Sequence, residues 1–407
     1  MRKNGVNKQL YPIDGGICAP AGFVVGGVAC DIAKNLRLFS RETENTENIE
    51  KEDLGALKGD ARYAVAGTFT KASEFSAIFP MTEKTLRSGY ARAVLVQNGV
   101  TNVYGEKGKR NAWNMRASLA KYATIREEDI IVLSTGGVGA PFKAENVLKN
   151  MRLLSERCGR TEENRRAFLN AVGGRDKIAK EFAFSFDLGD FPCKIGAVCN
   201  NENATVCIIT TDVNISPDML QKALQSAVSQ TFDLLDVNGT SSLSDGIYAI
   251  ASGMAGNYTI SAPDSEYKKF ANALKNAMFQ ICLQISRKRD TDISFVCNVQ
   301  SARSFRSAGE RAKAIVSAND VKSDLKSGRV CVENILNAMY ATGEDFNLEK
   351  TEISLCIGTK ELVLFDSGRT IPADTQTFLR ETKTKEMKLN VRLNEGNYSA
   401  VSIGRII

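Results

Sequence analysis

Along this chain, segments in which hydrophobic residues recur at every second position alternate with segments in which they recur every three or four positions. This alternation predicts strands and helices in turn. Strands are expected where apolar residues run together or recur at every second position, as the phenylalanines of 181–188 do. Helices are expected where the recurrence is three or four residues, as over 111–123, 144–156, 217–228 and 270–281. The remaining expected strands are 91–97, 130–133, 205–209, 293–299, 353–357, 361–365, 387–393 and 399–403. This alternation predicts an α/β protein in which helices cover sheets.

Glycine-rich and polar stretches interrupt the pattern. Residues 15–28 are glycine-rich and apolar and are expected to form strand and turn. They lack Gly-x-Gly-x-x-Gly and Gly-Lys-Ser/Thr, so neither a phosphate loop nor a dinucleotide (Rossmann) site is expected. Residues 41–53 contain one aliphatic residue in thirteen and are expected to be a solvated loop, and 105–108 a turn.

Composition narrows the class of protein. The 407 residues are 43% hydrophobic and 25% charged, as in ordinary globular proteins, and the net charge of +6 arises from 53 basic and 47 acidic residues mixed along the chain. A nucleic-acid partner is therefore not expected. No apolar run approaches the roughly 18 residues of a membrane span, and no signal peptide follows the first residues, so a cytoplasmic protein without a membrane partner is expected. The ten cysteines are scattered without a Cys-x-x-Cys pair and are expected to be mostly buried.

The chain contains no histidine. This excludes Ser-His-Asp and Cys-His nucleophiles and makes a zinc site improbable, so no metal site is expected. A group that acts as a general base near pH 7 must then be a carboxylate with a raised pKa, a desolvated lysine or an α-amine. The ordinary pKa of an α-amine is about 7.7 to 8.0. A threonine at a new N-terminus carries the nucleophilic hydroxyl and the basic amine in one residue. Thr205 follows Ala204 at the start of an apolar run, and it could serve in this way if the bond between the two were cut. An ordinary strand threonine is the alternative.

A second candidate lies in the small, glycine-rich turn 134–139, which follows the expected strand 130–133. Glycine lets the main chain approach a ligand closely, so such a turn can offer backbone N–H groups to a developing anion. An ordinary turn is the alternative.

One segment resembles a known family. Residues 194–207, Lys-Ile-Gly-Ala-Val-Cys-Asn-Asn-Glu-Asn-Ala-Thr-Val-Cys, are similar without a gap to the nucleophile segment of the ornithine acetyltransferases, the glutamate N-acetyltransferases of the cyclic arginine pathway. Four further segments match that family in order: 91–103, 134–139, 210–213 and 232–245. The chain is identified as a divergent member of these ArgJ-like, self-cleaving acyltransferases with an N-terminal threonine.

The resemblance implies a fold and an activity. The fold would be a layered sandwich of sheets covered by helices, of the ornithine acetyltransferase/DmpA-like kind. The precursor would cut itself between Ala204 and Thr205 into an α-like chain, 1–204, and a β-like chain, 205–407, which form a heterodimer that assembles into a heterotetramer. Thr205 would accept an acetyl group from N2-acetylornithine as an ester and pass it to glutamate in a ping-pong cycle of arginine biosynthesis.

Site roles follow from the same resemblance, position by position. Thr205 would be the nucleophile, Thr135 and Gly136 the oxyanion donors, and Lys194 a substrate ligand. Asp290 stands where the family has a glutamate that holds the substrate amine. No cofactor is implied, and acetyl-coenzyme A is left open as an alternative acyl donor.

The sequence also departs from the family. The substrate segment Thr-Thr-Asp-Thr falls near 174–177, where this chain has Gly-Arg-Asp-Lys, and the family's C-terminal Asn-Ala-x-Tyr ligands are missing. Three interpretations therefore remain open. The chain is a glutamate N-acetyltransferase, or another N-acyltransferase or amidohydrolase of the superfamily with a changed substrate, or an unprocessed homologue that serves as a binding or structural subunit.

Overall fold

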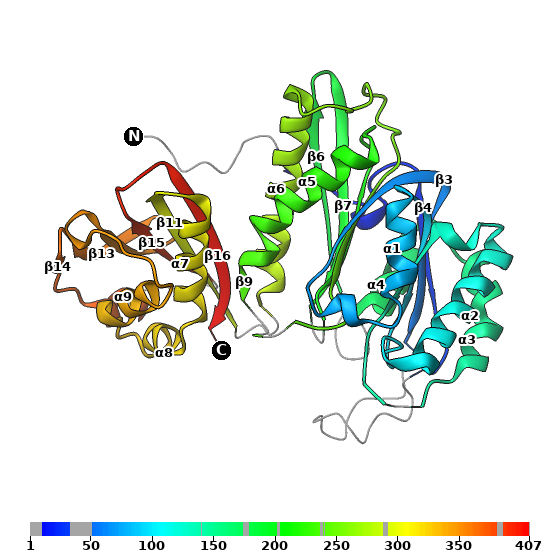
Figure 1. Ribbon diagram of the computed structural model, residues 1–407, viewed down its shortest axis with the longest axis horizontal. Helices are drawn as coiled ribbons and strands as arrows, with labels where there is room; N and C mark the ends of the chain where they lie inside the picture. The colour runs from blue at the N-terminus through cyan, green and yellow to red at the C-terminus, as the bar shows by residue number, and fades with distance from the viewer. Residues whose placement is uncertain are drawn as a thin grey trace. The chain divides into compact units, whose positions relative to one another are not determined.

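A computed structural model describes residues 10–32, 51–139, 141–173, 179–201, 204–236, 239, 241–287, 292–380 and 386–406. The chain divides into two compact units (Figure 1): unit 1 is Met1–Gln225 with Ser241–Ala277, and unit 2 is Ser226–Thr240 with Met278–Ile407. Each unit contains a sheet with helices packed on it, so the predicted α/β architecture is confirmed. Asp290 and most of the predicted loop 41–53 lie outside the described residues.

The strands of unit 1 are β1 (Tyr11–Pro12), β2 (Phe23–Val28), β3 (Leu54–Thr68), β4 (Tyr90–Gln97), β5 (Ile130–Ser134), β6 (Lys180–Leu188), β7 (Phe191–Asn200), β8 (Val206–Thr211) and β10 (Gly246–Ala251). Within the described ranges they form one sheet in the order β1-β6-β7-β8-β10-β3-β4-β5, with β2 beside β3. Only β4–β5 and β8–β10 pair in parallel there. The sheet is therefore mixed, unlike the doubly wound parallel sheet of a Rossmann fold.

Helices cover both faces of this sheet. They are α1 (Phe79–Arg87), α2 (Gly105–Ala123), α3 (Ala144–Glu156) and α4 (Glu162–Gly173), with α5 (Pro217–Ser229) and α6 (Ser265–Ile285) passing from unit 1 into unit 2. Alternate residues of β4 point to opposite faces: Leu95 belongs to the core cluster that includes Met115 of α2, and Val94 to the cluster that includes Phe168 of α4. Figure 1 shows α2 and α3 side by side.

Unit 2 has its own sheet and core. Its strands are β9 (Leu235–Asp236), β11 (Ile293–Ala302), β12 (Glu352–Ile357), β13 (Lys360–Asp366), β14 (Arg369–Thr370), β15 (Glu386–Arg392) and β16 (Tyr398–Ile406), in the order β14-β13-β12-β15-β11-β16-β9 among the described residues. Its helices are α7 (Phe305–Ser317), α8 (Asn319–Ser327), α9 (Val332–Tyr340) and α10 (Thr375–Arg380). Ser304 begins α7 as an N-cap, since its side chain accepts the N–H of Ser307.

The predicted elements are confirmed with shifts at their ends, and one is wrong. Residues 105–108, predicted to be a turn, form the first turn of α2. The predicted boundary at Ala204-Thr205 lies inside unit 1, so the segments on either side of it both supply strands to one sheet. The division into two chains stays a prediction.

Three further findings bear on function. None of the helices in the described part of the chain is long and apolar enough to cross a membrane. The same residues contain no group of three or more His, Cys, Asp and Glu side chains placed to hold a metal ion. Seven of the ten cysteines are buried, as predicted.

Candidate active site

Thr205 lies at the entrance to a central strand of unit 1. β7 and β8 are antiparallel neighbours with Asn200 opposite Val206, so the chain turns between them just before Thr205. Ala204 is buried and Thr205 is half-buried. The apolar run from Val206 forms β8, as the sequence predicted, and it fixes the Ala204–Thr205 bond at the edge of the core.

Asp245 contacts the Thr205 backbone directly. β8 and β10 are parallel with Val206 opposite Gly246, so the residues that precede the two strands lie side by side. The Thr205 N–H donates to Asp245 Oδ1 at 2.7 Å. The Gly246 N–H donates to the Thr205 carbonyl at 2.9 Å. Thr205 is therefore held at both its nitrogen and its carbonyl oxygen.

The Asp245 carboxylate is itself fixed. Its Oδ2 accepts the N–H of Ser242 at 2.7 Å, and its carbonyl accepts the hydroxyl of Ser73 at 2.7 Å. Burial raises the pKa of Asp245, while the hydrogen bonds from the N–H groups of Ser242 and Thr205 lower it. Two charge-assisted hydrogen bonds from backbone N–H groups hold this carboxylate toward Thr205.

The glycine-rich turn after β5 presents unused donors. The N–H groups of Thr135 and Gly137 donate to the carbonyls of Gln97 at 2.9 Å and Gly99 at 3.0 Å. Gly136, between them, has a φ of +126°, and its N–H meets no acceptor in the part of the chain that the structure describes. The Thr135 hydroxyl is buried there and likewise has no partner among those residues. Burying such a hydroxyl costs about 1–3 kcal/mol, which a ligand would offset.

One loop connects this turn to Thr205. Ser244, which precedes Asp245, donates through its hydroxyl to the carbonyl of Ser134 at 2.8 Å, and Ser134 precedes Thr135. A cavity of about 20 Å³ lies beside Asp245 and Ser134. It has room for about one water molecule. The structure thus links Thr205, Asp245 and the Thr135-Gly136 turn through a single short loop.

Lys194 lies elsewhere on the same hairpin. In the antiparallel register Ile195 is opposite Thr211, so Lys194 is at the Asp212 end of β8 and its N–H donates to Asp212 Oδ1 at 2.7 Å. Thr205 is at the other end of that strand, roughly 20 Å away at about 3.3 Å per residue. The structure does not bring Lys194 to Thr205, and its role as a substrate ligand stays a prediction.

The sequence predicted Thr205, Thr135 and Gly136 as catalytic residues, but it did not predict Asp245. The signal was present, because Asp245 ends the segment 232–245 that matches the family in order. Its contact with Thr205 depends on the pairing of β8 with β10, which joins residues 40 positions apart. Asp290, the other predicted ligand, lies outside the described residues.

The similarity to known proteins extends over nearly the whole chain. The ArgJ bifunctional arginine biosynthesis protein of Caldanaerobacter subterraneus is 26% identical over 401 residues, 96% of this chain and 95% of that protein. A glutamate N-acetyltransferase of Methanopyrus kandleri is 27% identical over 392 residues, 95% of each chain. The solved structure of ArgJ from Bacillus halodurans matches with a TM-score of 0.45 and 25% identity, covering 49% of this chain and 93% of that one. The ArgJ family model matches residues 41–405, and the chain therefore belongs to the ArgJ family.

Proposed function

We propose that this chain is a self-activating N-acyltransferase that moves an acetyl group from N2-acetylornithine to glutamate through an ester on Thr205. Membership of the ArgJ family supports this activity, as do relatives that are named glutamate N-acetyltransferase and arginine biosynthesis protein. The single observation that carries the proposal is the hydrogen bond of 2.7 Å from the Thr205 nitrogen to Asp245 Oδ1.

Activation begins at the Ala204–Thr205 bond. The Thr205 hydroxyl oxygen attacks the Ala204 carbonyl carbon and loses its proton, and the amide nitrogen gains a proton as the C–N bond breaks. The acyl group thereby moves from nitrogen to oxygen as an ester. Water then hydrolyses the ester, leaving an Ala204 carboxylate and a free Thr205 α-amine. The hydrogen bond to Asp245 and the bond from Gly246 to the Thr205 carbonyl hold the residue through both steps.

Transfer uses the same atoms. The free amine takes the proton of the Thr205 hydroxyl as its oxygen attacks the acetyl carbonyl of the donor. The departing donor amine receives a proton, and the acetyl group remains on Thr205 until the amine of glutamate takes it. The Gly136 N–H and the Thr135 hydroxyl, both without partners among the described residues, are the donors for the oxyanion of each tetrahedral intermediate. Each such donor is worth roughly 2.7–4 kcal/mol.

Assembly and location follow the family resemblance. The two products remain associated as an α/β heterodimer within a heterotetramer, in the cytoplasm. No cofactor takes part, and acetyl-coenzyme A is an alternative acyl donor. The sheet of unit 1 gives a physical reason for association, because β7 from the first segment and β8 from the second are hydrogen-bonded neighbours.

A second candidate function is N-acyl transfer with a different acyl acceptor or donor. The position of Lys194 favours it, since this predicted substrate ligand lies beside Asp212 at the far end of the hairpin from Thr205. A pocket that lacks a ligand for a charged substrate group discriminates strongly against that substrate.

An exchange assay tests the proposal. Purified protein is incubated with N2-acetylornithine and isotopically labelled glutamate, and labelled N-acetylglutamate is measured by mass spectrometry. We expect steady formation of labelled product and, with the donor alone, a covalent acetyl group on the fragment that begins at Thr205. Acetylation of Thr205 by another acyl donor, without exchange to glutamate, would favour the second candidate. Neither acetylation nor exchange would contradict both.

Replacing Gly136 with alanine is expected to slow acetyl transfer about 100-fold, as loss of an oxyanion donor does. The new Cβ would lie 2.3 Å from the Gly99 carbonyl carbon, so the turn and its N–H must move. Gly139→Ala is the matched control, because Gly139 also has a positive φ, +76°, but a Cβ added there would meet no described atom within 4 Å. Equal rates for the two variants would exclude the Gly136 N–H from catalysis.

A further inference from the structure

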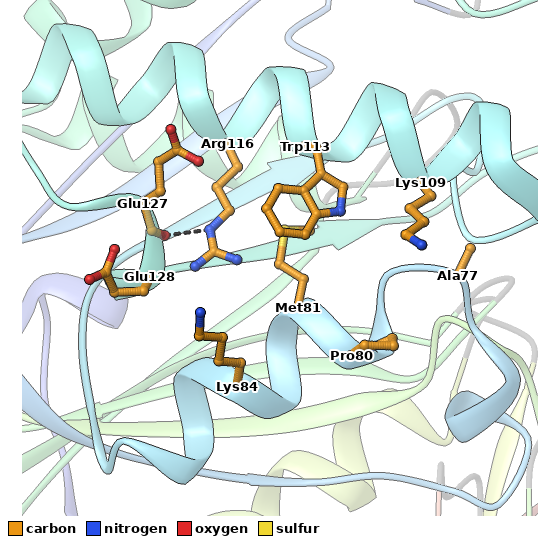
Figure 2. A pocket seen from close by; sticks show the side chains of 9 residues that line it. All are labelled: Ala77, Pro80, Met81, Lys84, Lys109, Trp113, Arg116, Glu127 and Glu128. Carbon is orange, nitrogen blue, oxygen red and sulfur yellow. Dashed lines mark hydrogen bonds between the residues drawn. The ribbon is translucent and has the colours of Figure 1, made fainter.

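A groove of about 470 Å³ lies in unit 1 between α1, α2 and the short turn at Glu127–Glu128 (Figure 2). α1 separates it from the candidate active site. Ile78 and Thr82 of this region face the cavity beside Asp245, whereas Met81 and Lys84 line the groove. The groove is therefore a second, distinct site on the same unit.

Arg116 is buried in this groove without an ion pair to any described residue. The residue is only 2% exposed, and its Nε donates to the carbonyl oxygen of Glu127. Within the described residues its two terminal nitrogens have no hydrogen-bond partner. The nearby carboxylate of Asp129 is occupied by Arg62 and Arg126, each at 3.0 Å. Burial lowers the pKa of Arg116, while the charges of Glu127, Glu128 and Asp129 raise it without forming an ion pair with it. The guanidinium is therefore only partly compensated, and its terminal nitrogens remain accessible to a ligand in the groove.

A second cation points at the same place. Figure 2 shows the Lys84 ammonium below the Arg116 guanidinium and directed toward it. Lys84 forms no ion pair with the rest of the described chain, whereas the third cation of the groove, Lys109, has Glu106 at 3.8 Å. Two like charges that face one another repel, and an anion between them would turn this repulsion into attraction.

The wall beside these cations is aromatic and apolar. The Trp113 ring lies 5.8 Å from the Arg116 guanidinium carbon and is 44% exposed, and the buried Met81 lies beneath it (Figure 2). The ring therefore offers an accessible flat apolar face beside the two cations. The arrangement suits a ligand that has a charged end and an apolar body.

Two carboxylates at the rim limit what the ligand can be. Glu128 has Arg126 at 3.7 Å, so part of its charge is compensated outside the groove. Glu127 forms no ion pair among the described residues, and Figure 2 shows its carboxylate turned away from the Arg116 guanidinium. These carboxylates would repel a polyanion, so a ligand with a single negative charge is favoured. The planar guanidinium also matches a carboxylate in bidentate geometry.

We propose that this groove binds a small organic carboxylate, with the carboxylate between Arg116 and Lys84 and an apolar or aromatic body against Trp113 and Met81. The site is independent of the acetyl-transfer chemistry at Thr205. Its ligand is recognised by one negative charge next to a flat hydrophobic surface.

Trp113 is the only tryptophan of the chain and reports binding directly. The full-length protein is titrated with phenylacetate while tryptophan fluorescence is excited at its red edge. We expect a saturable change with a Kd of about 1 mM or tighter. Phenylacetamide, which has the same shape without the charge, is expected to bind at least about tenfold more weakly, a difference of about 1.4 kcal/mol.

Variants distinguish binding in the groove from binding elsewhere on the protein. Lys84→Met and Arg116→Met are expected to weaken phenylacetate binding about tenfold or more, since each removes one of the two facing cations. Glu127→Gln is expected to tighten it, and Arg110→Met, on the exposed side of α2, to leave it unchanged. Arg116→Met is also expected to keep or raise the thermal midpoint, because the buried cation that it removes has no ion pair among the described residues. This gain is expected to offset the lost hydrogen bond to the Glu127 carbonyl.

Three results would overturn the proposal. The first is the absence of a saturable change up to about 10 mM phenylacetate, ten times the expected upper limit of the Kd. Equal binding of phenylacetamide would show that charge is not recognised. Loss of stability in both Arg116→Met and Glu127→Gln would mean that these two side chains pair structurally with each other, and that the groove needs no ligand.

Discussion

Replacing Thr205 with alanine is expected to leave the chain uncut and to abolish acetyl transfer. The variant keeps its backbone N–H and so keeps the hydrogen bond to Asp245, but it lacks the hydroxyl that attacks the Ala204 carbonyl. Without cleavage there is no free α-amine, and without the hydroxyl there is no oxygen to carry the acetyl ester. Intact-mass spectrometry should give one species of 44.3 kDa for the variant and two fragments for the native protein, one beginning at Thr205.

Thr205→Ser is the matched control. Serine keeps the hydroxyl and loses one methyl group, so cleavage and transfer should persist at reduced rates. An uncut native protein that still transfers acetyl groups would show that the Thr205 α-amine is not the base. Cleavage in the alanine variant would show that a protease acts, and an uncut native protein without activity would support a binding or structural role.

The local pattern was enough to predict the elements around the nucleophile. The run 205–209 became β8, and the helix predicted over 144–156 has those same ends in the structure. Both predictions are correct because a buried strand and a helix with one buried face each give the hydrophobic residues a characteristic spacing in the sequence. The family resemblance then supplied the predicted roles of Thr205, Thr135 and Gly136, which periodicity alone could not give.

Glycine was the main source of error at the level of elements. Gly105 and Gly108 suggested a turn, but they begin α2. Gly108 lies against the Asn102 carbonyl, where a Cβ would come within 2.5 Å of the oxygen. Close packing, rather than a turn, therefore explains this glycine, and such a contact between the helix and the preceding loop leaves no periodic signal.

The candidate site depends on contacts between residues that are far apart in the sequence, and these contacts could not be predicted from local patterns. Asp245 reaches Thr205 because β8 and β10 pair in parallel, and a parallel pairing is set by the whole sheet rather than by either strand. Conversely, the family resemblance implied that Lys194 is a substrate ligand, whereas the antiparallel hairpin places it and Thr205 at opposite ends. Residues three or four positions apart are neighbours on a helix, whereas each residue along a strand adds about 3.3 Å to their separation.

Replacing Asp245 with alanine is expected to slow acetyl transfer about 1000-fold, because Thr205 and Ser242 each lose a hydrogen bond to a charged group, worth about 1.5–3 kcal/mol apiece. Cleavage at Ala204–Thr205 should slow as well, so the variant is followed by intact mass and, once cut, by exchange of label into N-acetylglutamate. Ser242→Ala is the control, since it keeps the backbone N–H that Asp245 accepts. If the Asp245→Ala variant cuts and transfers at native rates, the contact is structural only.

Asp245→Asn separates charge from geometry. The amide oxygen can still accept the Thr205 N–H, whereas the amide nitrogen cannot accept the N–H of Ser242. The negative charge beside the amine is gone. A carboxylate favours the protonated amine and so raises the pKa of the Thr205 α-amine, and its removal lowers that pKa. Only the neutral amine is a base, so activity rises with pH as this group loses its proton, and the rise should lie at lower pH in the variant. The pH dependence of the exchange rate measures this shift, and a profile that is lowered uniformly without moving would mean that Asp245 orients the amine without tuning it.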